Sequence, residues 1–191
     1  MRPNSQLARQ AARLALVGGS FQLLYGVLAI FYSYGGENSR GWSEALWIVA
    51  CLGMAGAAAG MLLLPDVGKP RWLARLGGGA TLVGVGMRIA AAVVLLLGSP
   101  FEPLPLILLS ILLMLVGMLL LGIATVRGET IDGWRAWSPI LVSIFGFMVA
   151  AIYDVSLYAH FILLGLWGAT WMLVGNVVLA KASPPPTAGQ G

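Results

Sequence analysis

Hydrophobic positions in this chain form long unbroken runs. Six of them reach the roughly 20 mostly apolar residues that a helix needs to cross a bilayer. These runs cover about 12–34, 43–64, 72–98, 104–126, 137–155 and 158–180. Membrane β-strands alternate with a period of two residues, and a run such as LPLILLSILLMLVGMLLLGIATV (104–126) does not alternate. The pattern predicts an all-α fold, a polytopic transmembrane bundle of six helices with short loops.

The runs predict one transmembrane domain over residues 1–181, because every loop is too short to fold separately. Arg2, Arg9 and Arg13 at the start of the chain are typical of a signal peptide. However, the first apolar run is too long and no small-residue cleavage site follows, so we expect a retained helix. The end of the chain, 182–191, reads ASPPPTAGQG. It has too few apolar residues to pack, which predicts a disordered cytoplasmic tail.

Basic residues are divided unequally between the two sets of loops. Nine lie in the N-terminal segment, the second and fourth loops and the tail. On the other side Arg40 stands among Glu37, Glu44, Glu102 and Asp154. Short cytoplasmic loops carry an excess of Lys and Arg. We therefore expect a multi-pass protein of a cytoplasmic (inner) membrane of bacterial type, with both termini in the cytoplasm.

Composition narrows the function classes. Hydrophobic residues make up 59% of the 191 and charged residues 9%, whereas a soluble domain has about 25% charged residues. The net charge of +4 is scattered beside apolar runs without a basic stripe, so no nucleic-acid partner is expected. Cys51 and His160 are the single cysteine and histidine. They cannot form an intrachain disulfide, a zinc site of several Cys and His ligands or a bis-histidine haem site. We predict no metal and no cofactor.

Small residues recur at four-residue spacing in the first two runs. They are Ala11, Ala15 and Gly19 in the first run and Gly56 and Gly60 in the second. Membrane helices associate through stripes of this kind, because small residues let two backbones approach closely. Two interpretations stay open: packing inside the bundle, or docking of another membrane subunit.

The tryptophans fall into two groups. Trp42, Trp72, Trp134 and Trp137 lie at predicted helix ends, which is typical of the interfacial aromatic belt. Trp167 and Trp171 lie deep in the last run and share a helical face with His160 and Leu164. This deep pair either packs against neighbouring helices or lines a cavity.

Arg88 stands inside the apolar segment GVGMRIAAAVVLLLG, residues 84–98. An arginine at the bilayer centre costs about 2.5–3.5 kcal/mol on insertion scales. At about 1.5 Å per residue, Arg88 lies roughly 24 Å beyond Trp72, in the outer half of the membrane. Its face of the helix is small and polar, and consists of Thr81, Gly84, Ala91 and Ala92. We expect this face to turn into the bundle, with Asp154 as the best candidate partner.

Arg88 has two interpretations. In the first it forms a structural ion pair with Asp154 or reaches outward to lipid phosphate. In the second it holds an anionic group in an outward-facing pocket for an amphiphile such as a lipid, a quinone or a vitamin-like acid. The candidate binding residues are Arg88, Asp154, His160, Tyr153, Tyr158, Trp167 and Gln22.

Three function classes remain. The chain has no GxSxG, HExxH, phosphate-binding glycine loop or paired carboxylates, so an enzyme is not favoured, and His160 with Asp154 would be its acid–base couple. In gross plan the chain is similar to the substrate-binding subunit of energy-coupling-factor vitamin transporters, although no diagnostic motif carries the similarity. That similarity implies solute binding and docking through the stripe on the first helix. The preferred interpretation is a binding protein for an amphipathic or anionic small molecule, and the alternative is a non-catalytic subunit of a larger membrane complex.

Overall fold

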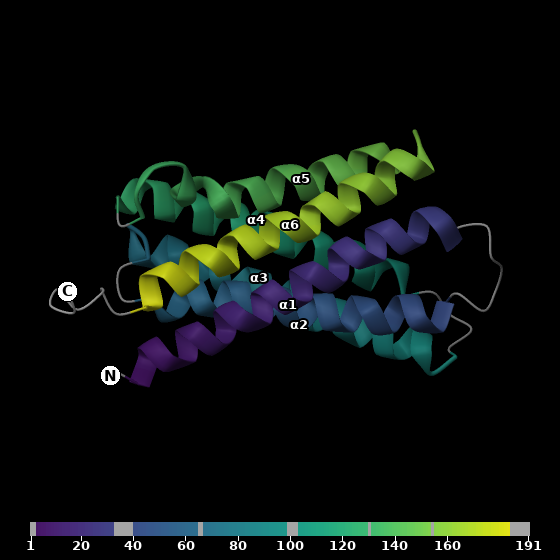
Figure 1. Ribbon diagram of the computed structural model, residues 1–191, viewed down its shortest axis with the longest axis horizontal. Helices are drawn as coiled ribbons and strands as arrows, with labels where there is room; N and C mark the ends of the chain where they lie inside the picture. Colours follow the sequence, from purple (N-terminus) through teal and green to yellow (C-terminus); the bar gives the residue numbers. More distant parts are fainter. Residues whose placement is uncertain are drawn as a thin grey trace, which may run out of the picture.

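The protein is a bundle of six long helices (Figure 1). The computed structural model describes residues 3–32, 40–64, 67–98, 103–129, 131–153 and 155–183, and these contain no strand. The helices are α1 (Pro3–Tyr32), α2 (Arg40–Leu63), α3 (Arg71–Leu96), α4 (Leu104–Gly128), α5 (Ser138–Ile152) and α6 (Leu157–Ala182), with a 3-10 helix, η2 (Gly133–Trp137), before α5. All six, with η2 counted as part of α5, are long and apolar enough to cross a membrane. The predicted fold class is confirmed. Most of the predicted disordered tail, from residue 184 on, lies outside the described residues.

Local sequence explains several helix ends. Pro70 precedes α3 in extended conformation, and a proline stands in the first turn of α4 and of α5, where its missing N–H breaks no helical hydrogen bond. Ser156 caps α6, because its hydroxyl accepts a hydrogen bond from a backbone N–H in the first turn at 3.3 Å. α1 begins at Pro3 and not near residue 12. Its arginine-bearing start contains no glycine or second proline to interrupt the helix.

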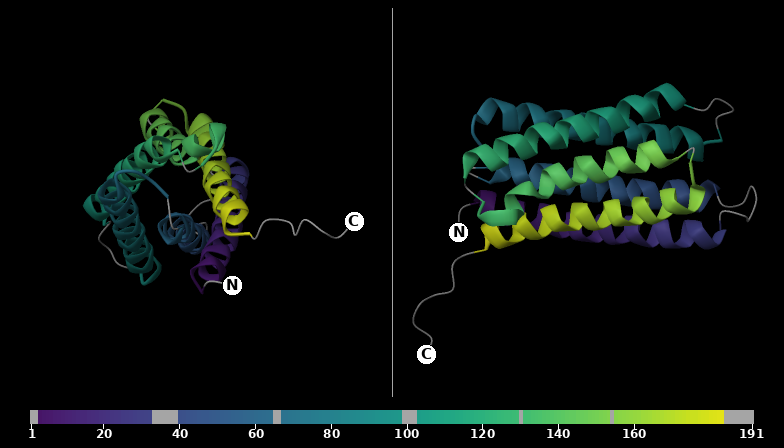
Figure 2. Two further views of the ribbon diagram at one scale, coloured as in Figure 1. Left: turned by 90° about the vertical axis from the view of Figure 1, so that its left-hand side faces the viewer. Right: turned by 90° about the horizontal axis from the view of Figure 1, so that it is seen from above.

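The helices are arranged in a closed ring in chain order (Figure 2). Each packs against the next, α6 packs against α1, and α2 also contacts α6. α3 packs against α2 and α4, so α4 stands between α3 and α5. Met114, Met118 and Leu121 of α4 and Trp171 of α6 are fully buried in the core.

Glycines bring α1 into close contact with both of its neighbours. Gly18 of α1 faces Gly53 of α2, and a Cβ added to either would meet the backbone of the other. Gly26 faces Gly165 of α6, where an added Cβ would lie 2.6 Å from the backbone nitrogen. Such close packing drives helix association in lipid, where the surrounding tails are as apolar as leucine. α1 therefore packs closely against both α2 and α6.

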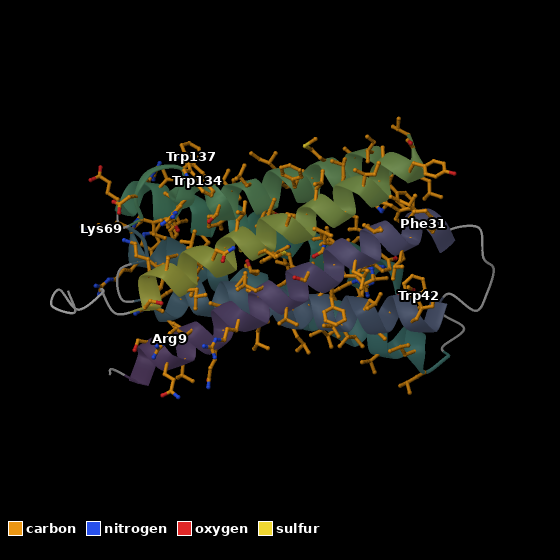
Figure 3. All side chains as sticks on the ribbon, viewed as in Figure 1. Arg9, Phe31, Trp42, Lys69, Trp134 and Trp137 are labelled. Carbon is orange, nitrogen blue, oxygen red and sulfur yellow. The ribbon has the colours of Figure 1, made fainter. Side chains whose placement is uncertain are left out.

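The two ends of the bundle differ in charge. The start of α1 and the end of α6 lie at one end, here called the terminal end, and the opposite end is called the distal end (Figures 1 and 2). Arg9 and Lys69 lie at the terminal end with Trp134 and Trp137, whereas Trp42 lies at the distal end (Figure 3). The basic residues thus gather where the sequence predicted. Which end faces the cytoplasm stays a prediction.

Candidate functional site

Arg88 lies on the face of α3 that was predicted to turn inward. It is 6% exposed, and Thr81, Gly84, Ala91 and Ala92 are buried with it. It lies eight positions before the end of α3 at Leu96, which places it about 12 Å from the distal end of the helix. Since a guanidinium does not lose its charge, a side chain buried at this depth needs a partner within the bundle.

Glu44 of α2 is this partner. Nη1 and Nη2 of Arg88 each donate to Oε2 of Glu44 at 3.2 Å, and the two side chains are only 7% and 13% exposed. The structural ion pair was one of the two interpretations of Arg88, and the carboxylate that the structure places beside it is that of Glu44, since α3 packs against α2. The predicted partner, Asp154, lies outside the described residues, so its part in the pair stays a prediction.

Trp47 covers the guanidinium. The central carbon of the guanidinium, Cζ of Arg88, lies 4.8 Å from the centre of the indole ring, within the range of a cation–π contact. Trp47 follows Glu44 by three residues on α2, so the same helical face supplies the carboxylate and the ring.

Aromatic contacts continue from the distal end into the bundle. Tyr25 contacts Trp42 and Trp47, with ring centres 6.0 and 5.9 Å apart. Trp47 contacts Trp167 at 6.5 Å, and Trp167 contacts Trp171 at 6.1 Å. We call these five residues the aromatic chain. Its members come from α1, α2 and α6, so the deep tryptophans pack against neighbouring helices, which was one of their two interpretations.

Two polar atoms beside the aromatic chain are buried without a hydrogen-bond partner. They are Oε1 of Gln22, whose side chain is 1% exposed, and Nε1 of the fully buried Trp171. The amide nitrogen of Gln22 donates to the carbonyl of Leu164 at 3.4 Å. By contrast, Nε1 of Trp167 donates to the carbonyl of Val142 at 2.8 Å. An unpartnered buried polar group costs about 1–3 kcal/mol and calls for an explanation such as a water or a bound molecule.

Two further predicted binding residues, Tyr153 and His160, contact each other where α5 meets α6. Nδ1 of His160 donates to the carbonyl of Val149 at 3.0 Å, and its ring lies 4.9 Å from that of Tyr153. Tyr153 and Tyr158 are both exposed. The described contacts of His160 stay within α5, α6 and the turn between them. Six of the seven predicted residues are described, and Asp154 is not. Arg88 and Trp167 both contact Trp47 of the aromatic chain. Whether the seven residues form one site stays a prediction.

The small-residue stripes are used inside the bundle. The five residues concerned are Ala11, Ala15, Gly19, Gly56 and Gly60. A Cβ on Gly56 would lie 2.6 Å from the carbonyl oxygen of Ala11, and one on Gly19 would lie 2.7 Å from a carbonyl oxygen of α6. Ala15 is fully buried. α2 and α6 therefore already occupy the surface that was a candidate for docking a partner.

Sequence reasoning missed Glu44 and Trp47. Both fall inside the predicted second helix, 43–64, and a carboxylate inside an apolar helix is the same kind of anomaly as Arg88. The three-residue spacing of Glu44 and Trp47, which puts them on one face, was a signal that could have found them.

Among the described residues, no group of three or more His, Cys, Asp or Glu side chains could hold a metal ion. The chain matches no protein-family model, and no curated protein or solved structure matches it either. The functional assignment therefore rests on the geometry of the molecule.

Proposed function

We propose that this protein is a membrane-embedded binding protein for an amphipathic small molecule, with its site along the aromatic chain, which runs from the distal end to the middle of the bundle. The observation that carries the proposal is the pair of unpartnered atoms on Gln22 and Trp171 beside that chain. One is an acceptor and the other a donor. Both lie in the apolar part of the bundle, where a missing hydrogen bond is costly.

The ion pair narrows the class of ligand. Glu44 neutralises the charge of Arg88 in the ion pair. The pair as a whole therefore does not attract an anionic ligand. The rings of the aromatic chain are tilted against one another and supply apolar surface that suits a planar or chain-like apolar body. We therefore favour an amphiphile with an uncharged polar head that both donates and accepts a hydrogen bond. A lipid, a quinone-type molecule or a vitamin-like solute with a hydroxyl or amide group meets this description.

Orientation follows from the charge of the two ends. The basic terminal end would face the cytoplasm by the excess of Lys and Arg in cytoplasmic loops. The proposed site would then be reached from the outer leaflet, past Trp42 and Tyr25. This arrangement suits a protein of a bacterial-type inner membrane that takes up its ligand from the outer side.

The test is native mass spectrometry of the protein extracted in lipid nanodiscs, with the released small molecules identified. We expect a bound molecule in the natural protein, and at least tenfold lower occupancy in Gln22→Leu, which removes the free acceptor. Ser110→Ala is the matched control. Ser110 is also buried in the distal half, but its hydroxyl donates to a carbonyl of its own helix at 2.6 Å. Equal occupancy in both variants, or no bound molecule in the natural protein, would contradict the proposal.

A second candidate function is that of a non-catalytic subunit in a larger membrane complex, which includes a transporter subunit. Gly79 and Gly86 of α3 favour it, because a Cβ at either would meet nothing within 4 Å. They leave part of the outer surface of α3 without side chains. Gly86→Leu should leave the bundle folded and reduce co-purification of partner chains. Partner chains that co-purify without any bound small molecule would favour this function over the first.

A further inference from the structure

A cavity lies at the terminal end of the bundle, between η2 and the last turns of α6, far from the aromatic chain. Its volume is about 520 Å³, and its walls include Trp134, Arg135, Asn176, Val177 and Ser183. A second cavity of about 240 Å³ adjoins it and shares Arg135, Val177 and Ala180. Together they form what we call the η2–α6 groove.

Charge in the groove is unbalanced. Arg135 and Lys181 line it together with Asp132, so two cations face one carboxylate. Nζ of Lys181 lies 3.8 Å from Oδ2 of Asp132, but the Asp132 side chain is 95% exposed, so solvent weakens this pair. The net charge of the groove is positive, and Arg135 retains donors for an oxyanion.

Asn176 gives an independent indication of a ligand. It lies six residues before the end of α6 at Ala182, about 9 Å below the rim. Asn176 is exposed and lines the groove. A side-chain amide on the outer surface of a membrane helix is costly unless a polar partner meets it. Leu173 and Val177 beside it supply an apolar wall.

Trp134 indicates the depth at which the groove lies in the membrane. Its ring is 61% exposed and lies at the terminal end (Figure 3), as expected for an indole at headgroup level. A molecule in the groove thus meets the cations near the rim, the amide of Asn176 and the side chain of Val177 about 9 Å below it, and the apolar side chain of Leu173 deeper still. This order of chemistry matches a phosphate-bearing amphiphile.

We propose that the η2–α6 groove binds the phosphate headgroup of an anionic phospholipid. Arg135 and Lys181 hold the phosphate, and Asn176 donates to its ester oxygens. Asp132 accepts from hydroxyl groups of the headgroup, as in phosphatidylglycerol. This site is separate from the proposed distal site and does not depend on it.

The test uses the delipidated full chain in detergent, titrated with dioleoyl phosphatidylglycerol or dioleoyl phosphatidylcholine and followed by native mass spectrometry. We expect phosphatidylglycerol to bind at a concentration at least tenfold lower than phosphatidylcholine does. Arg135→Gln with Lys181→Gln should weaken phosphatidylglycerol binding about tenfold. The matched control is Arg127→Gln with Lys69→Gln, which removes the same charge from the same end outside the groove and should change binding less than twofold.

Equal loss in both double variants would mean diffuse charge attraction and would overturn the proposal, as would equal binding of the two lipids. Asn176→Leu keeps the charge of the groove and should weaken phosphatidylglycerol binding severalfold. Unchanged binding would show that the amide of Asn176 does not contact the headgroup and would contradict the proposed site. Inorganic phosphate in tenfold excess should fail to displace the lipid, because it lacks the chains that contact Leu173 and Val177. Displacement by phosphate alone would show a site for free phosphate and would overturn the assignment to a lipid. Circular dichroism of each variant checks that the bundle is folded.

Discussion

Breaking the Arg88–Glu44 pair from the carboxylate side is the most direct probe of what holds this bundle together. Glu44→Gln keeps the shape of the side chain and removes its charge. The guanidinium would then remain inside the bundle at 7% exposure without a counter-charge. The cation–π contact with Trp47 would persist, and it contributes about 0.5–2 kcal/mol.

The magnitude follows from the burial of the pair. Removing one partner of a buried ion pair costs about 3–5 kcal/mol, because the other charge is left uncompensated. Arg88 lies only about 12 Å from the distal end, so its long side chain can turn partly toward the rim. We therefore expect the lower end of this range, about 3 kcal/mol. Replacing both partners by apolar residues, Glu44→Leu with Arg88→Met, should stay within about 1 kcal/mol of the natural protein or exceed its stability.

The assay is the free energy of unfolding, measured by SDS titration of the protein in bicelles with far-UV circular dichroism. Arg75→Gln is the control, because Arg75 lies on the same helix and is exposed. Its effect should be within about 0.5 kcal/mol. If Glu44→Gln costs no more than this control, Glu44 does not stabilise the buried charge. If Glu44→Leu with Arg88→Met costs as much as the sum of Glu44→Leu alone and Arg88→Met alone, the two residues are not coupled.

Three further results are expected. Gly18→Ala should lower the free energy of unfolding by about 1–3 kcal/mol, since its Cβ would meet the backbone of α2. The control, Gly86→Ala, adds a Cβ into open space and should be neutral or stabilising by up to about 1 kcal/mol. Equal effects of the two variants would contradict the close packing of α1 against α2. Trp167→Phe removes an indole donor bonded to a carbonyl of α5 and should lower the free energy of unfolding by about 0.5–1.5 kcal/mol in the same SDS titration. The control is Trp72→Phe, at an exposed tryptophan, which should change it by less than about 0.5 kcal/mol. A larger effect of Trp72→Phe than of Trp167→Phe would show that the hydrogen bond of Trp167 contributes nothing. Val155→Cys places a thiol on an exposed position at the distal end, while the native thiol is buried. An impermeant maleimide should label it in intact cells, and labelling only after permeabilisation would reverse the proposed orientation.

The distribution of residues along the chain was enough for the spans and for the inward face of α3. Only helices and closed barrels satisfy every backbone hydrogen-bonding group in lipid. Because these apolar runs do not alternate as membrane β-strands do, the helix is the structure that remains. The face of Arg88 could be assigned because small and polar residues at helical spacing turn away from lipid. The need of Arg88 for a partner followed from its charge.

The identity of that partner could not be read in the same way. Sequence position gives the depth of a residue in the membrane, and Glu44 and Asp154 were both assigned to the outer side. The lateral order of the helices brings Glu44 to Arg88, and that order depends on which glycine faces fit together, such as Gly18 against Gly53. The small-residue stripes were limited in the same way. They predicted that another helix packs closely against them, but they did not identify that helix.

The sequence alone thus determined that six helices cross a membrane and that a charge lies buried among them, since both follow from the solvation of single residues and segments. Only the tertiary structure decided that Glu44 and Trp47 hold Arg88, that Gln22 and Trp171 are left with unpartnered atoms, and that a groove forms beside η2. These features depend on contacts between segments far apart in the chain. The complementary shapes of packed helices set such contacts, and one-dimensional hydrophobicity does not encode them.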